Sequence, residues 1–226
     1  MVRLWPRLNT VRLKNFVRLY VMRLNKRFFK YALLFTAPFL LLLIYYAPFY
    51  LMYKDTPGKS QVIVLFLGPA FEARKQEAYR LLLNGYADYL IIPAYNQIFH
   101  IRNQELIVSE LQMSFFSSHF EKKEENEVVT MRRLMEGTHL ELLHAREMMD
   151  KASFRSAIFV SSPYHMRRLK LIGEKLLDKS VYTLFFVPSS YETVHQNLWL
   201  FYEYDRSWII KEYAKMFWFF LYTTIY

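Results

Sequence analysis

The residues whose types and spacing best suit chemistry are 161–168, which read Ser-Ser-Pro-Tyr-His-Met-Arg-Arg. His165 titrates close to neutral pH, and Arg167 and Arg168 add two fixed positive charges within one helical turn of it. Guanidinium groups bind phosphate and carboxylate through paired hydrogen bonds, while a histidine can donate or accept a proton. The motif therefore predicts a site for an anionic ligand, with His165 as a candidate acid or base.

The position of this motif favours the same chemistry. It follows the apolar run 157–160, which is typical of a buried strand, and it leads into residues 167–177, whose apolar spacing is typical of a helix. The first backbone N–H groups of a helix have no partner inside it and attract anions. We expect Ser161 or Ser162 to cap this helix and to leave other N–H groups for a ligand.

Other polar residues follow the remaining predicted strands. In an open α/β sheet, ligands bind outside the carboxyl ends of the strands. Cations, hydroxyls and carboxylates gathered there suit an oxyanion ligand and general acid or base work. The residues that this rule collects are Glu72, Arg74, Asn96, Glu136, Thr138, His139, Glu141, Ser162, His165, Arg167 and Arg168.

Several of these residues also have a purely structural interpretation. Glu72 and Arg74 fit an exposed helix as well as they fit a site. Thr138 and Glu141 stand at the spacing of a capping box, in which each side chain binds a backbone N–H at the start of a helix. We favour the capping box for this pair.

The sequence predicts no metal site and defines no cofactor. His139 and His144 are interpreted as surface residues, because no second ligand accompanies them at metal-binding spacing. The chain has no cysteine, no Walker lysine and no Gly-x-Ser-x-Gly sequence.

Apolar runs and helical stripes alternate along the chain. The run 61–68 ends in glycine and suits a strand buried on both faces of a parallel sheet. Helical spacing follows in 70–84, then a strand in 89–93, a helix in 139–151 and, after the motif, a strand in 181–187. This alternation predicts an α/β fold with a Rossmann-like, open, mostly parallel sheet and helices on both faces.

The stretch between the second strand and the helix at 139 is less regular. Residues 105–120 have helical spacing, and a charge run at 121–126 is typical of a solvated loop or helix end. Residues 127–135 fit the start of a helix as well as a third strand.

The net charge of +10 is concentrated at the N-terminus. Residues 1–30 hold nine lysines and arginines and no acid, so 21 basic and 20 acidic residues remain for everything that follows. A nearly neutral body does not have the charge of a nucleic-acid-binding domain, so no nucleic-acid partner is predicted.

This basic leader precedes the uncharged stretch Tyr31–Tyr53. Its length as a helix is about 35 Å, enough to cross a bilayer core of about 30 Å. Five aromatic residues near its end are typical of a membrane interface. We favour an uncleaved transmembrane anchor over a signal peptide or a buried soluble helix, with the leader in the cytoplasm and the remainder outside it.

The remaining segments complete the predicted organisation. Residues 1–30 fit either a helix lying on anionic lipid or a disordered arm, and 54–60 form a short linker. Residues 61–205 are the α/β domain, and 206–226 are a C-terminal amphipathic helix. We favour packing of residues 208–226 on the sheet; the alternative is a helix that also rests on the membrane through its aromatic residues.

The Tyr-His-Met-x-Arg sequence of residues 164–168, downstream of a strand that ends in glycine, resembles the YdcF/SanA/ElyC-like family (the DUF218 domain) of bacterial envelope proteins. The resemblance covers residues 61–187 and implies a Rossmann-type domain, often tethered by one N-terminal helix, in peptidoglycan or envelope glycan metabolism. The chain has Gly-Pro-Ala at 68–70 and Leu-His-Ala at 143–145, where the family has consecutive glycines and Glu-Asn-Ala. The matching positions are Gly68, Arg74, Thr138, Ser162, Tyr164, His165 and Arg168, with Glu136 near the family acid.

Together these features predict a membrane-anchored, extracytoplasmic α/β enzyme, a hydrolase or transferase, that acts on a phosphate-bearing or lipid-linked envelope substrate. His165 and Glu136 are the candidate acid and base. A non-catalytic envelope binding or scaffold protein with the same pocket is the alternative, and the sequence leaves the oligomeric state open. The candidate substrate-binding residues are Gly68, Arg74, Thr138, Ser161, Ser162, Tyr164, Arg167 and Arg168.

Overall fold

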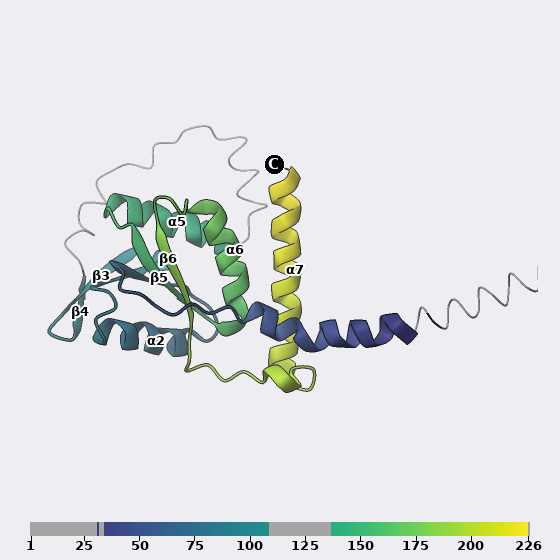
Figure 1. Ribbon diagram of the computed structural model, residues 1–226. Coiled ribbons are helices and arrows are strands. Elements are labelled where there is room, and N and C mark those ends of the chain that lie inside the picture. The colour runs from purple at the N-terminus through teal and green to yellow at the C-terminus, as the bar shows by residue number, and fades with distance from the viewer. Residues whose placement is uncertain (1–30, 32–33, 109–136, 226) are drawn as a thin grey trace, which may run out of the picture. The chain divides into compact units, whose positions relative to one another are not determined.

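The computed structural model describes Tyr31, residues 34–108 and residues 137–225 (Figure 1). The chain divides into two units, Met1–Tyr46 and Ala47–Tyr226. The second unit is an α/β domain. The basic leader 1–30 and the stretch 109–136 lie outside the described residues, so the alternatives proposed for 1–30 and for 127–135 stay predictions.

The domain is built on one mixed, mostly parallel sheet of six strands in the order β4-β3-β2-β1-β5-β6. β2, β1, β5 and β6 run parallel to one another, whereas β3 pairs antiparallel with β2, and β4 pairs antiparallel with β3 at one edge. The predicted α/β class and mostly parallel sheet are therefore confirmed. The strands are β1 (Val62–Leu65), β2 (Tyr89–Ile92), β3 (Gln97–Arg102), β4 (Glu105–Val108), β5 (Ser156–Ser161) and β6 (Thr183–Pro188).

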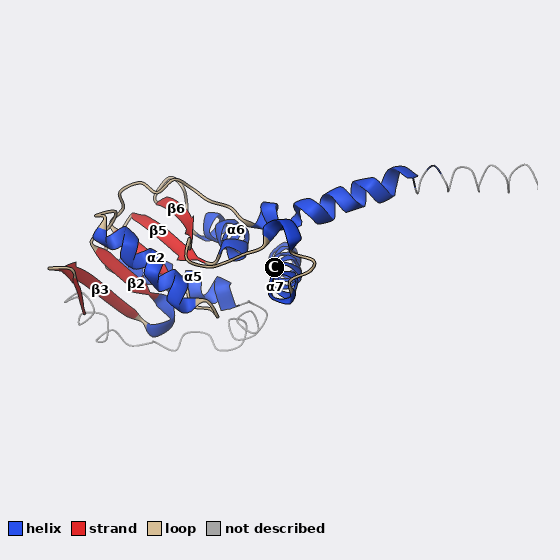
Figure 2. Cartoon of the chain, turned by 90° about the horizontal axis from the view of Figure 1, so that it is seen from below, coloured by secondary structure: helices blue, strands red, loops and turns tan. Residues whose placement is uncertain are grey.

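Helices cover both faces of this sheet, as the sequence predicted (Figures 1 and 2). One face packs against α2 and the other against α5 and α6, and α7 lies beside α6. The helices are α2 (Phe71–Leu83), α5 (Gly137–Lys151), α6 (Met166–Leu176) and α7 (Glu203–Ile225), with short 3-10 turns η1 (Pro93–Tyr95), η2 (Pro163–His165) and η3 (Gln196–Leu198).

The helix predicted over 105–120 is wrong at its start, where Glu105–Val108 forms β4. Asn103 and Gln104 both have positive φ, 52° and 65°, which makes the tight turn of a hairpin. Pairing with β3 then outweighs the helical spacing, because a two-residue turn fixes the register of the strands on either side. The rest of that predicted helix lies outside the described residues.

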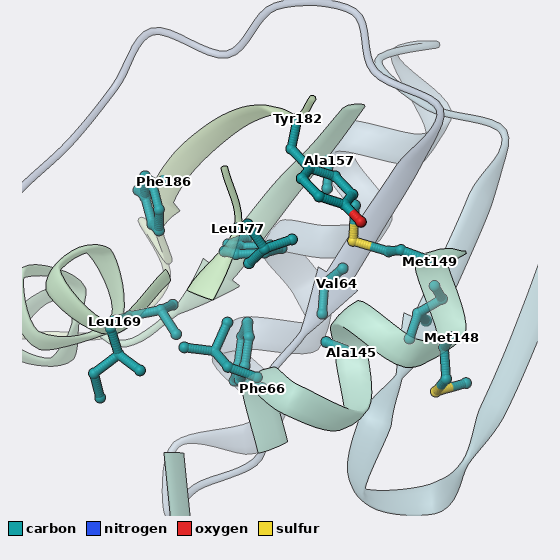
Figure 3. Close-up of a cluster of buried hydrophobic side chains, with 14 of the residues drawn as sticks. Val64, Phe66, Ala145, Met148, Met149, Ala157, Leu169, Leu177, Tyr182 and Phe186 are labelled. Atoms are coloured by element: carbon teal, nitrogen blue, oxygen red, sulfur yellow. The ribbon is translucent and has the colours of Figure 1, made fainter. Parts of the chain in front are cut away.

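Alternate residues of β1 serve two separate cores, because successive side chains of a strand point to opposite faces. Val62 and Val64 belong to a core with α5 and α6, whereas Ile63 and Leu65 belong to a core with α2. All four side chains are fully buried. Figure 3 shows Val64 among side chains from α5 and α6 in the first of these cores.

The predicted linker 54–60 is fastened to the domain. Asp55 N–H donates to the Phe186 carbonyl over 2.9 Å, and the Phe186 N–H donates to the Asp55 carboxylate over 3.0 Å. The hydroxyl of Tyr53 donates to the other carboxylate oxygen over 2.6 Å. One residue of the incoming chain therefore satisfies both outward groups of Phe186 on β6, the edge strand of the sheet.

Helix α7 packs on the domain through one face. Ile209, Glu212, Met216, Phe219 and Tyr222 recur every three or four positions, and all five are buried. A helix of this length also has an outer face, which in α7 carries several large apolar side chains.

In the described part of the chain, one helix is long and apolar enough to cross a membrane, with its window at Leu34–Leu51 and a mean hydropathy of 1.8. Helices of this length and composition near an N-terminus occur in membrane anchors and in signal sequences. Leu51, at its end, is fully buried with Tyr164, Trp199 and Ile209 in a third apolar cluster of the α/β domain.

Candidate functional site

Arg74 joins the ends of two parallel strands. It enters from α2 and is 2% exposed. Its Nε and Nη2 atoms donate to the Ser162 hydroxyl oxygen over 2.9 and 2.7 Å, and Nη1 donates to the carbonyls of Phe66, over 3.0 Å, and Leu67. Ser162 in turn donates to Glu192. The chain between β1 and α2 is thus tied to the end of β5, as the strand-end rule predicted.

Gly68 makes room for this guanidinium group. A Cβ at position 68 would lie 2.4 to 2.6 Å from three atoms of Arg74, well inside van der Waals contact. The side chain of Arg74 cannot retreat without giving up its hydrogen bonds to Ser162. Gly68 is therefore required by close approach of a neighbouring side chain, and its predicted contact with a ligand stays a prediction.

Arg168 forms a second buried cluster at the start of α6. It is 1% exposed, and its Nε and Nη2 atoms donate to the two carboxylate oxygens of Glu212 over 2.6 and 2.9 Å. Nη1 donates to the Thr138 hydroxyl over 2.7 Å, and Nη2 also donates to Nδ1 of His165 over 2.7 Å. A forked contact of this kind is the strongest ion-pair geometry available to arginine.

The contact with Arg168 fixes the state of His165. A guanidinium only donates, so Nδ1 of His165 accepts, and the ring hydrogen of the neutral form is on Nε2, which lies 3.5 Å from the Thr138 hydroxyl. Burial and the neighbouring positive charge of Arg168 lower the pKa of His165 to about 4. His165 is therefore neutral near pH 7, and Arg168 holds its ring in place.

Glu212 carries the compensating negative charge. Burial alone would raise the pKa of this carboxyl, but the forked contact with the Arg168 guanidinium holds the pKa well below the ordinary range. Arg168 Nη2 lies between Glu212 and His165 and donates to both, which accounts for the 3.4 Å between the two acceptor atoms.

Glu141 is the titratable group of the site. Its carboxylate accepts a hydrogen bond from the Leu67 N–H over 3.1 Å, in the turn that follows β1. Burial raises its pKa to about 7, although this hydrogen bond and the charges of Arg74 and Arg168 act in the opposite direction. A carboxyl group with such a pKa exists in both protonation states near neutral pH.

The proposed capping box is wrong. Helix α5 begins at Gly137, so Thr138 is already inside it, and the Thr138 hydroxyl accepts from Arg168. Glu141 reaches across to Leu67 and does not turn back to its own helix. The same two residues that could have capped α5 instead connect it to α6 and to the end of β1.

Beside these residues lies an open pocket with a volume of about 520 Å³. Arg168 and Glu141 stand in its wall together with Lys215 and Trp218 from α7. A volume of this size accommodates a small organic ligand. The full lining is Gly137, Thr138, Glu141, Arg168, Ala214, Lys215 and Trp218.

Two of the predicted site residues do not join the others. Arg167 points to the opposite side of α6, where its Nε donates to the Tyr50 carbonyl over 2.8 Å and its guanidinium lies 4.8 Å from the centre of the Tyr53 ring. Tyr164 is buried in the apolar cluster with Trp199. Burial, together with the nearby Asp205, raises the pKa of its hydroxyl above the ordinary value.

The remaining predicted residues that the structure describes make contacts within the fold and do not reach the pocket. Ser161 is fully buried, and its backbone carbonyl accepts from Ser189 over 2.9 Å. Glu72 pairs with Lys75 on the exposed side of α2. His139, interpreted as a surface residue, is buried, and its Nδ1 lies 2.8 Å from the Tyr222 hydroxyl. Glu136 is outside the described residues.

Sequence reasoning missed two acidic residues and the role of a third. Glu192 follows β6, and the strand-end rule finds it only when the rule is extended to the last parallel strand. Glu212 falls on the buried stripe of α7, where a lone carboxylate needs a buried cation. Glu141 is among the polar residues that the rule collects, but nothing in the nearby sequence indicates that its carboxylate contacts Leu67.

Within the described part of the chain, no three histidine, aspartate, glutamate or cysteine side chains stand close enough together to hold a metal ion. Comparisons with protein-family models, curated proteins and solved structures found no match to the chain. The function therefore has to be inferred from the geometry of the site itself.

Proposed function

We propose that the chain is a membrane-anchored α/β enzyme whose pocket beside Arg168 binds a phosphate-bearing or otherwise anionic substrate. The supporting observation is that a fixed guanidinium and a carboxyl group with a pKa of about 7 stand in the wall of the same pocket. Arg168 keeps its proton at every pH, although Glu212 compensates part of its positive charge, and Glu141 can give or take a proton under the same conditions.

In this proposal Glu141 takes the acid or base role that the sequence assigned to His165. A histidine with a pKa of about 4 is a weak base at neutral pH, and its Nδ1 is already engaged by Arg168. His165 instead positions Arg168 between itself and Glu212. Lys215, also in the pocket wall, adds a second cation for the anion.

The test is turnover of phosphate esters by the full-length protein in lipid vesicles, with p-nitrophenyl phosphate and bis-p-nitrophenyl phosphate as probes. We expect Glu141→Gln to lower kcat by about 100-fold or more, because general acid–base catalysis contributes about 10² to 10⁴. Glu147→Gln on the exposed side of the same helix is the matched control. Full activity of the Glu141→Gln protein would refute the proposed role.

The rival function is a binding protein that uses the same pocket without turnover. It is favoured by the rigid cluster that Arg168 forms with Glu212, Thr138 and His165, because a preformed site can bind a ligand without turning it over. Binding of inorganic phosphate by the intact chain, without hydrolysis of either ester, would support this function over catalysis.

The envelope location is part of the proposal. The apolar helix at Leu34–Leu51 and the nine basic residues before it are the observations that support it. By the positive-inside rule, the leader stays in the cytoplasm and the α/β domain lies outside, where a protein of the YdcF/SanA/ElyC type would meet cell-envelope substrates. Protease added to intact spheroplasts is expected to digest the domain. Protection of the domain until the membrane is lysed would place it in the cytoplasm.

A further inference from the structure

The outer face of α7 carries large apolar side chains that the domain leaves exposed. Phe217 is 70% exposed, and Ile210 is 58% exposed. These positions lie on the side of the helix opposite the buried stripe described above. We define the outer face of α7 by its exposed apolar residues, which are Ile210, Phe217, Trp218, Phe220 and Leu221.

The amount of exposed apolar surface on one helix is unusual for a soluble domain. Single apolar side chains are common on protein surfaces, but a contiguous group rimmed by polar residues marks an interaction site. Four of the five members fall within residues 217–221, so they form one patch in the C-terminal half of the helix.

Charges along α7 are sorted between its two sides. The acids Asp205 and Glu212 are fully buried, where they contact His195 and Arg168. The cations Arg206 and Lys211, and Lys215 nearer the apolar patch, are exposed. Beyond Glu203 at its start, the exposed side of α7 therefore carries positive charge alone.

We propose that the outer face of α7 lies in the interface of a bilayer that contains anionic lipid. An amphipathic helix with aromatic residues on one side and lysine or arginine at its border is the pattern of interfacial membrane helices. Tryptophan and phenylalanine insert at the level of the headgroups, and the cations contact lipid phosphates. The sorting of charge favours this partner over an apolar protein groove, which would not require the acids to be turned inward.

This contact is independent of the helix at Leu34–Leu51. It needs no particular arrangement of the two units, because it follows from the exposure and charge of α7 alone. Trp218 borders both this face and the pocket, but the contact with lipid does not require the pocket to be catalytic, so the failure of one does not imply the failure of the other.

The absence of cysteine makes the proposal directly testable. A single cysteine introduced as Phe217→Cys in the full-length chain can carry an environment-sensitive fluorophore in vesicles of phosphatidylglycerol and phosphatidylcholine. The matched control is Leu83→Cys on α2, which replaces another exposed apolar residue, 55% exposed. We expect a blue-shifted emission and quenching by spin-labelled lipid at position 217, and neither at position 83.

A charge-reversed protein separates contact with anionic lipid from contact with protein. Arg206→Glu with Lys211→Glu changes two exposed cations outside the pocket, and we expect it to lose most of the lipid quenching at position 217. Quenching at 217 no stronger than at 83 would overturn the proposal. So would a fluorophore shielded equally in neutral vesicles, because anionic lipid would then not be required. Self-quenching that rises with protein density would also overturn it, because it would indicate a second copy on this face.

Discussion

Arg74 and Arg168 are both buried at strand ends, yet their surroundings differ. Arg74 is shared among Ser162 and two backbone carbonyls, which lock the turn after β1. Arg168 is paired with a carboxylate and borders a pocket that also contains Glu141. A buried cation alone therefore does not define a functional site. A cation that shares a pocket with a titratable group is the stronger candidate.

The largest effect is expected from Arg168→Ala, which would leave Glu212 charged and unpaired in the interior. Removing one partner of a buried ion pair costs about 3–5 kcal/mol. We expect a loss of this size in the free energy of unfolding, measured by urea denaturation of the detergent-solubilised full-length chain. The double variant Arg168→Met/Glu212→Leu is the comparison, since removing both charges should restore much of the loss. A cost below about 1 kcal/mol for Arg168→Ala would show that Glu212 is not confined as described.

The second effect concerns Glu141, through the pH dependence of stability. Its pKa is raised from 4.5 to about 7 in the folded protein, so the folded state holds this proton more tightly than the unfolded chain. The stabilisation is complete below pH 4.5 and is lost as the pH rises through 7. A shift of this size is worth at most about 3 kcal/mol. We expect the difference in the free energy of unfolding between wild type and Glu141→Gln to change between pH 5 and pH 8. The wild type should become less stable relative to the variant at the higher pH.

Thermal unfolding across this pH range measures the second prediction, with Glu147→Gln as the control. Comparing two proteins at each pH cancels the contribution of every other titrating group, including His165. A difference that stays constant with pH would mean that Glu141 titrates normally and would weaken the proposed acid or base role.

The third prediction concerns Arg74 and its close contact with Gly68. Gly68→Ala should destabilise the fold by about 1–3 kcal/mol, because the added methyl group collides with the guanidinium of Arg74. In an Arg74→Ala background the same change should cost less, since the colliding group is gone and only the backbone strain of an alanine at φ 159° remains. This double-mutant cycle isolates the contact. Gly137→Ala is the control, as a Cβ there meets nothing within 4 Å. Additive costs at positions 68 and 74 would contradict the contact.

The smallest effect on stability is expected from a substitution of Lys75, next to Arg74 on the exposed side of α2. Lys75 pairs with Glu72 over 3.0 Å at the surface, and such pairs contribute about 0–1 kcal/mol. Lys75→Ala should therefore leave the midpoint of urea unfolding almost unchanged, whereas Arg74→Ala one position earlier should shift it clearly. Equal shifts would mean that burial does not distinguish these neighbours.

Much of this arrangement could be predicted because it depends on local pattern and a topological rule. The β5 run, the turn at Ser162 and the helix that starts at Met166 are visible in the sequence as periodicity, and parallel strands bring their carboxyl ends to one edge. That rule places Arg74, Ser162 and Arg168 at the same sheet edge without any knowledge of their contacts.

The parts that failed depend on direction or on long-range pairing. Arg167 and Arg168 are adjacent in sequence, but successive helical residues point about 100° apart, so only one can face the site. Glu212 is 44 positions from Arg168, on a helix that the sequence assigned to a separate segment. The pairing of β4 with β3 is likewise decided by a neighbouring strand.

Asp55 also affects whether copies of this domain can associate through the edge strand β6. An edge strand leaves backbone N–H and C=O groups unpaired, so it can form β-pairs with another chain. Asp55 occupies both outward groups of Phe186, and Pro188, two residues on, has no N–H to offer. Asp55, which connects the incoming chain to the domain, thus also prevents β6 from pairing with a strand of another molecule at this position.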